Sequence, residues 1–383
     1  MTGTAIAPAR ILHLHSTFSA GGKELRCVQL INAFGPGVQH TIVSAVPDRM
    51  EAAKLIARDI AVEYPRDFPS LQGKPLPGRL LRLARAMQGY DLVVTYNWGA
   101  IDAAMAHMVF SGHFGLPPLI HHEDGFNEDE RTRLKTRRNW YRRIALARAA
   151  RLVVPSETLE RIALVTWQLP INQVEQIANG ICTAAFERPG RGNAIPGIRK
   201  SEGDLWVGTL AGLRKVKNLP ALVRAFARLP EPWKLVIVGE GPEEAAIRTQ
   251  AAELGLTDRV HLPGFIAHPA NYVGLFDIFA LSSHSEQFPI SVIEAMAAGL
   301  PIVAPAVGDI AHMVSDENRS LIAPAGDEAA FADRLAETAS EATLRAQIGA
   351  ANREKARKEY DEGAMIARYR RLYANTMGRR SLP

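Results

Sequence analysis

One stretch in the second half of the chain decides how the rest is interpreted. Residues 283–301 read Ser-His-Ser-Glu-Gln-Phe-Pro-Ile-Ser-Val-Ile-Glu-Ala-Met-Ala-Ala-Gly-Leu-Pro. The apolar residues 275–281 predict a buried strand, and after Pro289 the apolar spacing becomes three and four, which predicts a helix. Gly299 is expected to end that helix, and residues 301–304 begin another strand. The stretch therefore predicts a strand–loop–helix–strand unit, as in a parallel sheet covered by helices.

Two glutamates of this stretch fall at different places in the predicted unit. Glu286 lies in the loop at the carboxyl end of a strand, and Glu294 lies in the first turns of the next helix. Between them, the backbone amides of residues 288–291 stand at a helix start, where the helix dipole favours an anion such as a phosphate or diphosphate. An isolated glutamate pair most often consists of two solvated side chains, so the interpretation depends on the neighbouring motifs.

Composition predicts an ordinary globular chain of two domains. The 383 residues are 47% hydrophobic and 22% charged, which suits two domains of usual size. Cys27 and Cys182 are too few for a disulfide framework and favour a reducing compartment. The longest mostly apolar run, 289–307, contains a glutamate and is interrupted by glycine and proline. We therefore expect a cytoplasmic protein without a secretory signal or a membrane span.

The net charge of +5 has a local origin. Residues 131–151 contain nine Arg or Lys and no acid, with aromatic and aliphatic residues between them. Three interpretations stay open: a basic amphipathic helix on an anionic membrane surface, a nucleic-acid site, or a solvated helix face. The last would be balanced by acids just upstream, which are Glu123, Asp124, Glu128, Asp129 and Glu130. No recognisable nucleic-acid module accompanies the stretch, so nucleic acid is not expected as a partner.

Both halves of the chain alternate predicted strands with predicted helices. In the first half, the predicted strands are 10–15, 40–45, 92–95, 118–122 and 152–156, and the predicted helices are 25–33, 50–59, 80–87 and 100–110. In the second half, the predicted strands are 205–210, 234–239, 259–262, 277–281 and 301–304, and the predicted helices are 219–228, 243–254, the one after Pro289, and most of 341–377. This alternation predicts parallel sheets with helices on both faces.

A stretch crowded with glycine and proline separates the two series and is typical of a linker. We expect an N-terminal domain over 1–187, a linker over 188–204 and a second domain over 205–360. A C-terminal helix over 361–383 is expected to return to the first domain. The predicted fold class is α/β, with two doubly wound Rossmann-like domains facing a central cleft.

Several motifs stand where open α/β sheets bind ligands, at carboxyl ends of strands. Gly21-Gly22 is either a flexible turn or a backbone that a ligand can approach, and it is not a dinucleotide fingerprint. His121-His122-Glu123-Asp124 follows a strand and suits hydrogen bonding to a hydroxylated substrate; a structural strand-end histidine is the alternative. No spacing typical of metal ligands accompanies this motif, so no metal is expected.

Two loops of the second domain complete the set. Arg214, Lys215 and Lys217 place three cations within four residues after a predicted strand, where they could neutralise a diphosphate or simply line a surface. Gly239-Glu240-Gly241 follows the next strand and is either part of a ligand loop or a tight turn.

In this order, the motifs resemble those of the GT-B glycosyltransferases, specifically family 4 of the retaining enzymes. The matching segments are 21–24 (Gly-Gly-Lys-Glu), 121–123, 177–181, 207–210, 236–242 and 286–301, together with Lys217. The resemblance covers nearly the whole chain, and the glutamate stretch is its most specific part.

The resemblance implies that the N-terminal domain binds the acceptor and that the second domain binds a nucleotide-sugar. It also implies a role for each matching residue. Glu294 would bind ribose hydroxyls of a nucleotide-sugar, the amides after Phe288 would hold its diphosphate with Lys217, and Glu286 would contact the transferred sugar. The expected donor-binding residues are Gly21, Gly22, Arg214, Lys217, Gly241, Phe288, Pro289, Ile290, Ser291 and Glu294. The expected catalytic residues are Glu286, Lys217 and one of His121 and His122, with Glu123 and Asp124 at the acceptor.

Two departures from the family pattern bear on the site. Gln287 stands where a glycine is common, which predicts a narrower sugar pocket, and Gly212 stands where an arginine is expected. Arg214 or Lys215 would then supply the second cation.

The resemblance implies a retaining transfer from a UDP-, GDP- or ADP-sugar to a hydroxyl of a glycan or lipid-linked acceptor in surface polysaccharide, lipopolysaccharide or glycolipid synthesis. No further cofactor is expected. A retaining hydrolase would hold two carboxylates about 5–5.5 Å apart, which the spacing of Glu286 and Glu294 does not demand. Front-face transfer without a sugar–enzyme bond is therefore the favoured mechanism. The alternatives are a nucleotide-sugar epimerase on the same fold and a non-catalytic nucleotide-sugar-binding subunit.

Overall fold

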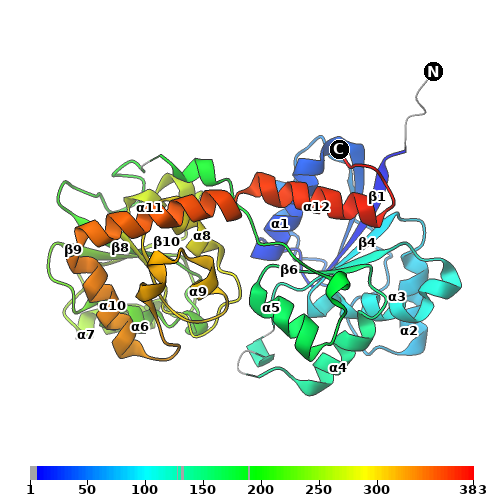
Figure 1. Ribbon diagram of the computed structural model, residues 1–383, viewed down its shortest axis with the longest axis horizontal. Coiled ribbons are helices and arrows are strands. Elements are labelled where there is room, and N and C mark those ends of the chain that lie inside the picture. Colours follow the sequence, from blue (N-terminus) through cyan, green and yellow to red (C-terminus); the bar gives the residue numbers. More distant parts are fainter. Residues whose placement is uncertain (1–6, 127, 131–132, 189) are drawn as a thin grey trace. The chain divides into compact units, whose positions relative to one another are not determined.

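The computed structural model describes residues 7–126, 128–130, 133–188 and 190–383. The chain forms two compact units (Figure 1). Unit 1 contains the chain up to Ala178 together with Met365–Pro383, and unit 2 contains Asn179–Ala364. Each unit is built on its own parallel sheet, so the predicted α/β class with two Rossmann-like domains is confirmed.

Unit 1 has a seven-stranded sheet in the order β3-β2-β1-β4-β5-β6-β7. Its strands are β1 (Ala9–His15), β2 (Val38–Ser44), β3 (Val62–Glu63), β4 (Leu92–Tyr96), β5 (Leu119–His122), β6 (Arg151–Val154) and β7 (Val174–Gln176). The described pairs of neighbouring strands all run parallel, which brings their carboxyl ends to one edge. The short edge strands β3 and β7 escaped prediction because two or three residues carry no readable alternation.

Helices and short turns connect these strands. They are α1 (Gly22–Phe34), α2 (Pro77–Ala86), α3 (Ile101–Phe114), α4 (Thr136–Ala145) and α5 (Glu157–Arg161), which continues as a π-turn over Ile162–Thr166. The helix predicted over 50–59 is wrong, because only a 3-10 segment, Glu51–Leu55, forms there. Ile56 is already extended, since the chain must turn at this point to reach the edge strand β3.

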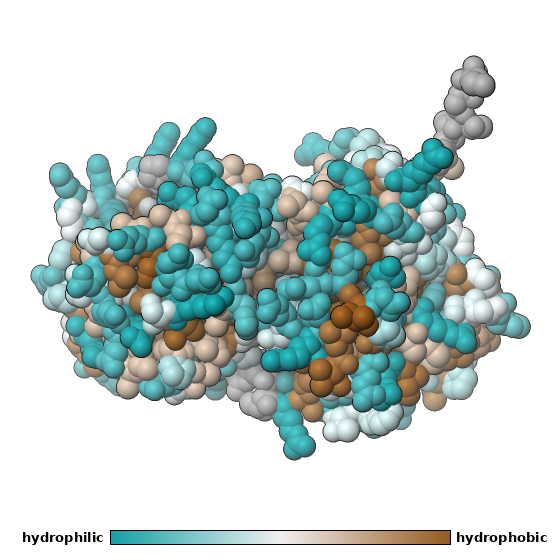
Figure 2. All heavy atoms as spheres, in the orientation of Figure 1, coloured by the Kyte–Doolittle hydropathy of each residue, from teal (hydrophilic) through white to brown (hydrophobic). Residues whose placement is uncertain are grey.

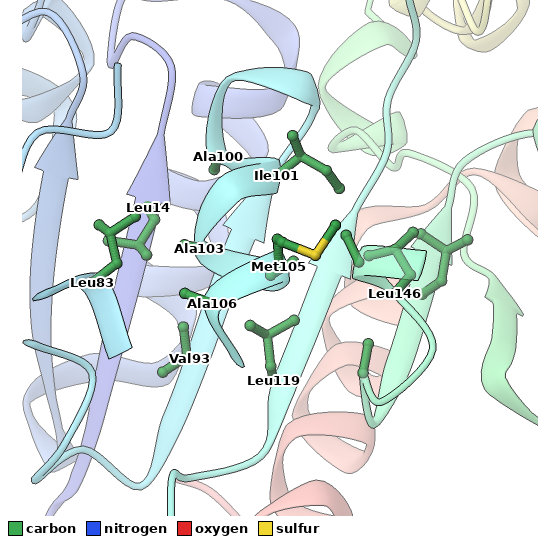
Figure 3. Close-up of a cluster of buried hydrophobic side chains, with 14 of the residues drawn as sticks. Leu14, Leu83, Val93, Ala100, Ile101, Ala103, Met105, Ala106, Leu119 and Leu146 are labelled. Atoms are coloured by element: carbon green, nitrogen blue, oxygen red, sulfur yellow. The ribbon is translucent and has the colours of Figure 1, made fainter. Parts of the chain in front are cut away.

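The core of unit 1 lies between the sheet and its covering helices. Figure 3 shows Val93 and Leu119 of adjacent strands beside Ala103 and Ala106 of α3. Small alanines on the inner face of α3 let the helix approach the sheet closely, and these four side chains are fully buried.

Unit 2 has a six-stranded parallel sheet in the order β10-β9-β8-β11-β12-β13. Its strands are β8 (Leu205–Leu210), β9 (Trp233–Val238), β10 (Val260–Gly264), β11 (Ile278–Ala280), β12 (Ile302–Pro305) and β13 (Ile322–Ala323). Its helices are α6 (Leu219–Phe226), α7 (Glu244–Glu253), α8 (Ile290–Ala297), α9 (Ile310–Met313), α10 (Glu328–Ser340) and α11 (Ala342–Glu359). Strands β8 and β11 are neighbours although β9 and β10 intervene in the chain, so the loops that follow β8 and β11 meet.

The division between the units falls at Ala178 and Ala364, whereas the sequence suggested limits at 187 and 360. Residues 179–187 belong to unit 2 because the backbone of Ile181 forms two hydrogen bonds with residues 360–362 of the same unit. Its amide donates to the Tyr360 carbonyl, and its carbonyl accepts from the Glu362 amide, both at 2.9 Å. The glycine- and proline-rich segment also packs on unit 2, where Lys200 Nζ donates to Asp277 at 2.6 Å.

The last helix, α12 (Glu362–Thr376), completes the core of unit 1. Tyr369 and Tyr373 are fully buried, and the Tyr373 ring meets Phe34 of α1 edge-on at 5.8 Å. Arg370 donates to the Ala33 carbonyl at 2.8 Å.

Candidate functional site

The structure brings Lys217 and Glu286 together in unit 2. Lys217 Nζ lies 2.5 Å from Glu286 Oε1, and Ser283 Oγ donates to the same oxygen at 2.6 Å. Both charged side chains are mostly buried, at 17% and 10% exposed. A lysine held beside a carboxylate can present a cation to an anionic ligand while the carboxylate stays oriented.

The loops that carry this pair are joined by two further hydrogen bonds. Ser282 Oγ donates to the Lys217 carbonyl at 2.9 Å, and the His284 amide donates to the Val216 carbonyl at 2.8 Å. Because the loops follow the adjacent strands β8 and β11, the sheet order fixes the pair. Ser282 and Ser283 were missed by sequence reasoning, although they stand directly after the predicted strand.

The start of α8 has the geometry expected of an anion site. The helix begins at Ile290 with Pro289 as its capping residue, and no side chain caps it. Within the described residues, the amides of Ile290 and Ser291 have no acceptor, whereas Val292 donates to the Pro289 carbonyl. Phe288 packs edge-on against the Tyr360 ring at 5.8 Å. Open amides at a helix start attract an anion.

The carboxylate of Glu294 lacks a polar partner that would offset the cost of its burial. Its side chain has no hydrogen bond or ion pair in the part of the chain that the structure describes. Burial raises the pKa of Glu294 from 4.5 to about 7. The pKa of Tyr272 is also raised, by burial first and then by Glu294. Ligand hydroxyls that donate hydrogen bonds to this carboxylate would relieve its desolvation.

The second cation that the sequence left open is not paired in the structure. Arg214 and Lys215 are both exposed, and neither forms an ion pair with a described residue. Gly241 has a clear packing role: with φ at +155°, an added Cβ would lie 2.4 Å from the Leu213 carbonyl oxygen. This contact holds the loop after β9 against the loop after β8.

Gly308, which the sequence did not single out, packs against the backbone of Glu286. It follows β12, has φ at +57°, and an added Cβ would lie 2.5 Å from the Glu286 carbonyl oxygen. The adjacent Asp309 amide donates to the Gln287 carbonyl at 3.1 Å. The only available signal was a glycine shortly after a buried strand.

In unit 1, His122 is a buried residue whose two ring nitrogens both have hydrogen-bond partners. Arg26 can only donate, so its contact of 3.2 Å makes His122 Nδ1 an acceptor, and Nε2 then donates to Tyr373 Oη at 3.1 Å. Burial, and secondly Arg26, keeps the pKa of His122 well below its usual range. Arg26 also forms a bidentate ion pair with Asp124, whose side chain is 13% exposed.

His121 and Glu123 belong to a second buried polar group. His121 Nδ1 lies 2.8 Å from Thr95 Oγ1, while its Nε2 has no hydrogen bond within the described residues and lies 3.9 Å from Glu123. Glu123 accepts from Arg142 Nε at 3.0 Å, and Arg142 also reaches Glu130. His121, Glu123 and Arg142 are all fully buried. The structure therefore gives Glu123 an internal partner, Arg142, whereas the sequence suggested that Glu123 contacts the acceptor substrate.

The glycine pair opens α1. Gly21 is the residue before the helix, and Gly22 is its first residue and is exposed. Beside this turn, Lys23 donates to the Thr17 carbonyl at 3.3 Å and pairs with Glu24. These contacts hold the turn without covering Gly22.

One group of potential metal ligands occurs among the described residues, and sequence reasoning missed it. The ligand atoms of His13, His15 and Cys27 lie within 4.8 Å of one another in the buried interior of unit 1. Burial lowers the pKa of both histidines well below the usual value and raises the pKa of the Cys27 thiol to about 12. The alternation of His13 and His15 on one strand was the available signal.

Comparison with known proteins identifies both halves. Residues 11–185 match the family model described as Glycosyltransferase Family 4, and residues 190–355 match the model described as Glycosyl transferases group 1. Among curated relatives, N-acetyl-alpha-D-glucosaminyl L-malate synthase of Bacillus anthracis is 27% identical over 44% of this chain and 45% of its own length. The chain thus spans less than half of that relative. A putative glycosyltransferase, EpsF of Bacillus subtilis, is 26% identical over 77% of this chain and 78% of its own length.

Solved structures show the same fold over almost the full length. HepE of Anabaena in complex with UDP has a TM-score of 0.79 at 19% identity, covering 96% of this chain and 100% of its own. Sucrose-phosphate synthase of Thermosynechococcus elongatus has a TM-score of 0.76 at 20% identity, covering 96% and 99%. With both halves matched by glycosyltransferase models and the two-sheet fold shared, this chain is a glycosyltransferase of the GT-B fold.

Proposed function

We propose that this enzyme is a retaining glycosyltransferase that uses a nucleotide-diphosphate sugar. The observation that carries the proposal is the contact of Lys217 with Glu286 beside the open amide end of α8. Further support comes from HepE of Anabaena, whose structures hold UDP, UDP with glucose, and UDP-glucose. A UDP-sugar is therefore the first donor to test, before GDP- and ADP-sugars.

The donor is assigned to unit 2 in this proposal. The diphosphate lies at the amides of Ile290 and Ser291 and beside Lys217, where charge that develops on the leaving group is neutralised. Ribose hydroxyls donate to Glu294, whose half-buried carboxylate has no protein partner among the described residues. The exposed Arg214 supplies a second cation to the phosphates.

The proposed chemical step is a front-face substitution at the anomeric carbon. The bond from that carbon to the phosphate oxygen breaks, and the nucleoside diphosphate leaves with the electron pair. The acceptor hydroxyl forms the new bond on the same face, and its proton passes to a phosphate oxygen of the leaving group. Glu286, oriented by Ser283, hydrogen-bonds the transferred sugar and stabilises the positive charge on it.

The histidine pair has a supporting role in this proposal. His121 and His122 are fully buried, and their rings form hydrogen bonds to Thr95 and Tyr373 inside unit 1. We assign them to the shape of the acceptor domain and assign the chemistry to Glu286 and Lys217. The acceptor is a hydroxyl of a glycan or lipid-linked intermediate in surface polysaccharide or lipopolysaccharide synthesis; one relative is a lipopolysaccharide core glycosyltransferase of Rhizobium meliloti. Such synthesis places the enzyme in the cytoplasm.

Glu286→Gln tests the assignment most directly. The variant keeps the shape but weakens the contact with the sugar, and we expect kcat to fall by about 100-fold or more with little change in donor binding. Glu202→Gln, at an exposed residue of the same unit, is the matched control and should keep wild-type turnover. Full turnover of Glu286→Gln would end the catalytic assignment, and a sugar trapped covalently on Glu286 would replace the front-face mechanism by a two-step one.

The donor is identified by thermal shift with a panel of UDP-, GDP- and ADP-sugars, because a ligand that binds the folded state raises the melting temperature. Incubation with the stabilising donor alone then separates the alternatives: an isomerised nucleotide-sugar would indicate an epimerase. Binding without transfer to any acceptor would instead indicate a non-catalytic subunit. Activity that survives a chelator would support phosphate neutralisation by lysine and arginine without a divalent cation.

A further inference from the structure

The basic stretch 131–151 divides into cations that are internally paired and cations that are not. Lys135 and Arg138 pair with Asp129, at 2.5 and 2.8 Å. Arg142 is buried between Glu123 and Glu130. The acids just upstream therefore neutralise three of the nine cations. For these three, a solvated helix face balanced by neighbouring acids is a sufficient explanation.

The remaining described cations face outward. Arg133, Arg137, Arg148 and Arg151 are exposed and Arg143 is half-buried. None of these five forms an ion pair with a described residue. Residues 133–151 contain no acid that could neutralise them along the chain. An anionic partner would therefore meet cations that are not already satisfied.

Large apolar side chains lie among these cations. Trp140 is 57% exposed and Ile144 is 46% exposed, although both are residues that normally avoid water. Arg137, Trp140 and Ile144 are spaced by three and four along α4, so they share one helical face. Arg143 stacks on the Trp140 ring at 5.2 Å. We call Arg137, Trp140, Arg143 and Ile144 the outer face of α4.

The neighbouring element extends the apolar surface. Val165, in the π-turn after α5, is 69% exposed. This turn is tied to α4 because Trp167 Nε1 donates to Asn139 Oδ1 at 3.1 Å. In Figure 2, hydrophobic side chains gather on the visible face over the region of α5 and the turn that follows it.

The opposite side of α4 is fixed to unit 1, so its outer face has a defined direction. Arg142 and Ala145 are buried, and Tyr141 Oη donates to Asp102 at 2.6 Å. No helix among the described residues is both long and apolar enough to cross a bilayer. A surface of this kind can lie on a membrane without a spanning segment.

We propose that the outer face of α4 docks unit 1 on an anionic lipid surface. Tryptophan and isoleucine enter the interfacial region, while Arg137, Arg143 and the flanking Arg133 and Arg148 contact lipid phosphates. Tryptophan suits this depth because it combines a large apolar ring with a polar N–H group. The mixture of apolar and cationic groups fits a lipid surface better than a nucleic acid, which would leave Ile144 without a partner. The inference goes beyond the transfer reaction, and it needs no donor, acceptor or turnover.

Sedimentation with vesicles tests the proposal on the full chain. We expect binding to phosphatidylcholine vesicles that contain phosphatidylglycerol, weaker binding as salt rises, and little binding to phosphatidylcholine alone. Each arginine near the surface contributes about fivefold to affinity, so Arg137→Gln with Arg143→Gln should lower it by about 25-fold. Trp140→Ser with Ile144→Ser should also release the protein and abolish any change in tryptophan emission on binding.

The matched control lies at α7 of unit 2. Arg248→Gln on the helix, with Leu254→Ser directly after its end, removes one exposed cation and one exposed apolar side chain. This control should bind like the wild type. Equal binding to neutral vesicles, no binding to either kind, or unchanged binding by the α4 variants would each overturn the proposal. Loss of a solution dimer in the α4 variants, without vesicle binding by the wild type, would assign the face to a second copy of the chain. Because no substrate is present, these outcomes are independent of the proposed transfer reaction.

Discussion

Lys217 and Glu286 stand 69 residues apart in the chain and yet share an ion pair. Their meeting depends on the order of strands β8 and β11, which sequence spacing alone does not contain. The two glutamates of residues 283–301, by contrast, are close in sequence but differ in their surroundings. Glu286 lies in a loop and Glu294 lies in α8. Glu286 is oriented by a lysine and a serine, whereas Glu294 has no described partner and a raised pKa.

The raised pKa of Glu294 predicts a pH-dependent gain in stability from Glu294→Gln. The folded chain retains a proton that the unfolded chain releases, so the stabilising contribution of Glu294 is complete below pH 4.5 and is lost as pH rises through about 7. Glutamine stays neutral at every pH. The variant should therefore melt about 5 °C or more higher than the wild type at pH 8 and equally at pH 4.5, measured by calorimetry without ligand.

The same variant should bind the nucleotide donor more weakly, by about tenfold, because a neutral amide is a poorer acceptor for hydroxyls. An equal change in melting temperature at both pH values would contradict the burial argument. Donor binding as tight as that of the wild type would contradict the ligand assignment.

At the level of elements, most of the strands could be predicted because apolar runs bounded by glycine, proline and polar residues are strong local signals. The same signals placed Glu286 in a loop and Glu294 in a helix. What could not be predicted depends on distant partners: His122 is completed by Tyr373 of α12, and Glu123 by Arg142 of α4. The helix predicted over 50–59 failed because the route of the chain to β3 overrode its apolar spacing.

Helix α4 depends on one buried arginine, which yields a prediction about its stability. Arg142→Met would leave Glu123 buried without its cation and would leave Glu130 with Arg138 alone. The free energy of unfolding of unit 1 should therefore fall by about 3–5 kcal/mol. Arg143→Met, one residue further and on the outer face, should change it by less than about 0.5 kcal/mol. Urea titration followed by circular dichroism measures both variants.

A similar loss in both variants would show that the helix needs positive charge in general and not the buried contact. Replacement of Glu123 by Gln in the Arg142→Met background should recover part of the loss, because the uncompensated charge is then removed.

At the scale of the whole molecule, unit 1 is assembled from two separate parts of the chain. A chain that stops after Ala364 lacks Met365, Tyr369 and Tyr373, three buried members of the unit 1 core. Removing one large aromatic side chain from a core costs about 3–5 kcal/mol. We expect the truncated chain to lose the cooperative unfolding of unit 1 while unit 2 unfolds as before.

Limited proteolysis with mass spectrometry checks this expectation, because unit 2 should persist as a protected fragment while unit 1 is digested. Tyr373→Phe is the matched control: it keeps the ring and removes only the hydroxyl that His122 uses, so unit 1 should remain protected. Protection of both units after truncation would show that α12 is dispensable for the fold of unit 1.

The return of α12 to unit 1 also sets an order of events during synthesis. The ribosome releases residues 179–364 before residues 365–376, so unit 2 has all its parts while unit 1 still lacks a helix. Domains generally fold as units while the chain emerges, first the one that is complete. The segment made first would therefore finish folding last, and until α12 arrives the nascent chain carries an open apolar surface around Phe34 that chaperones can bind.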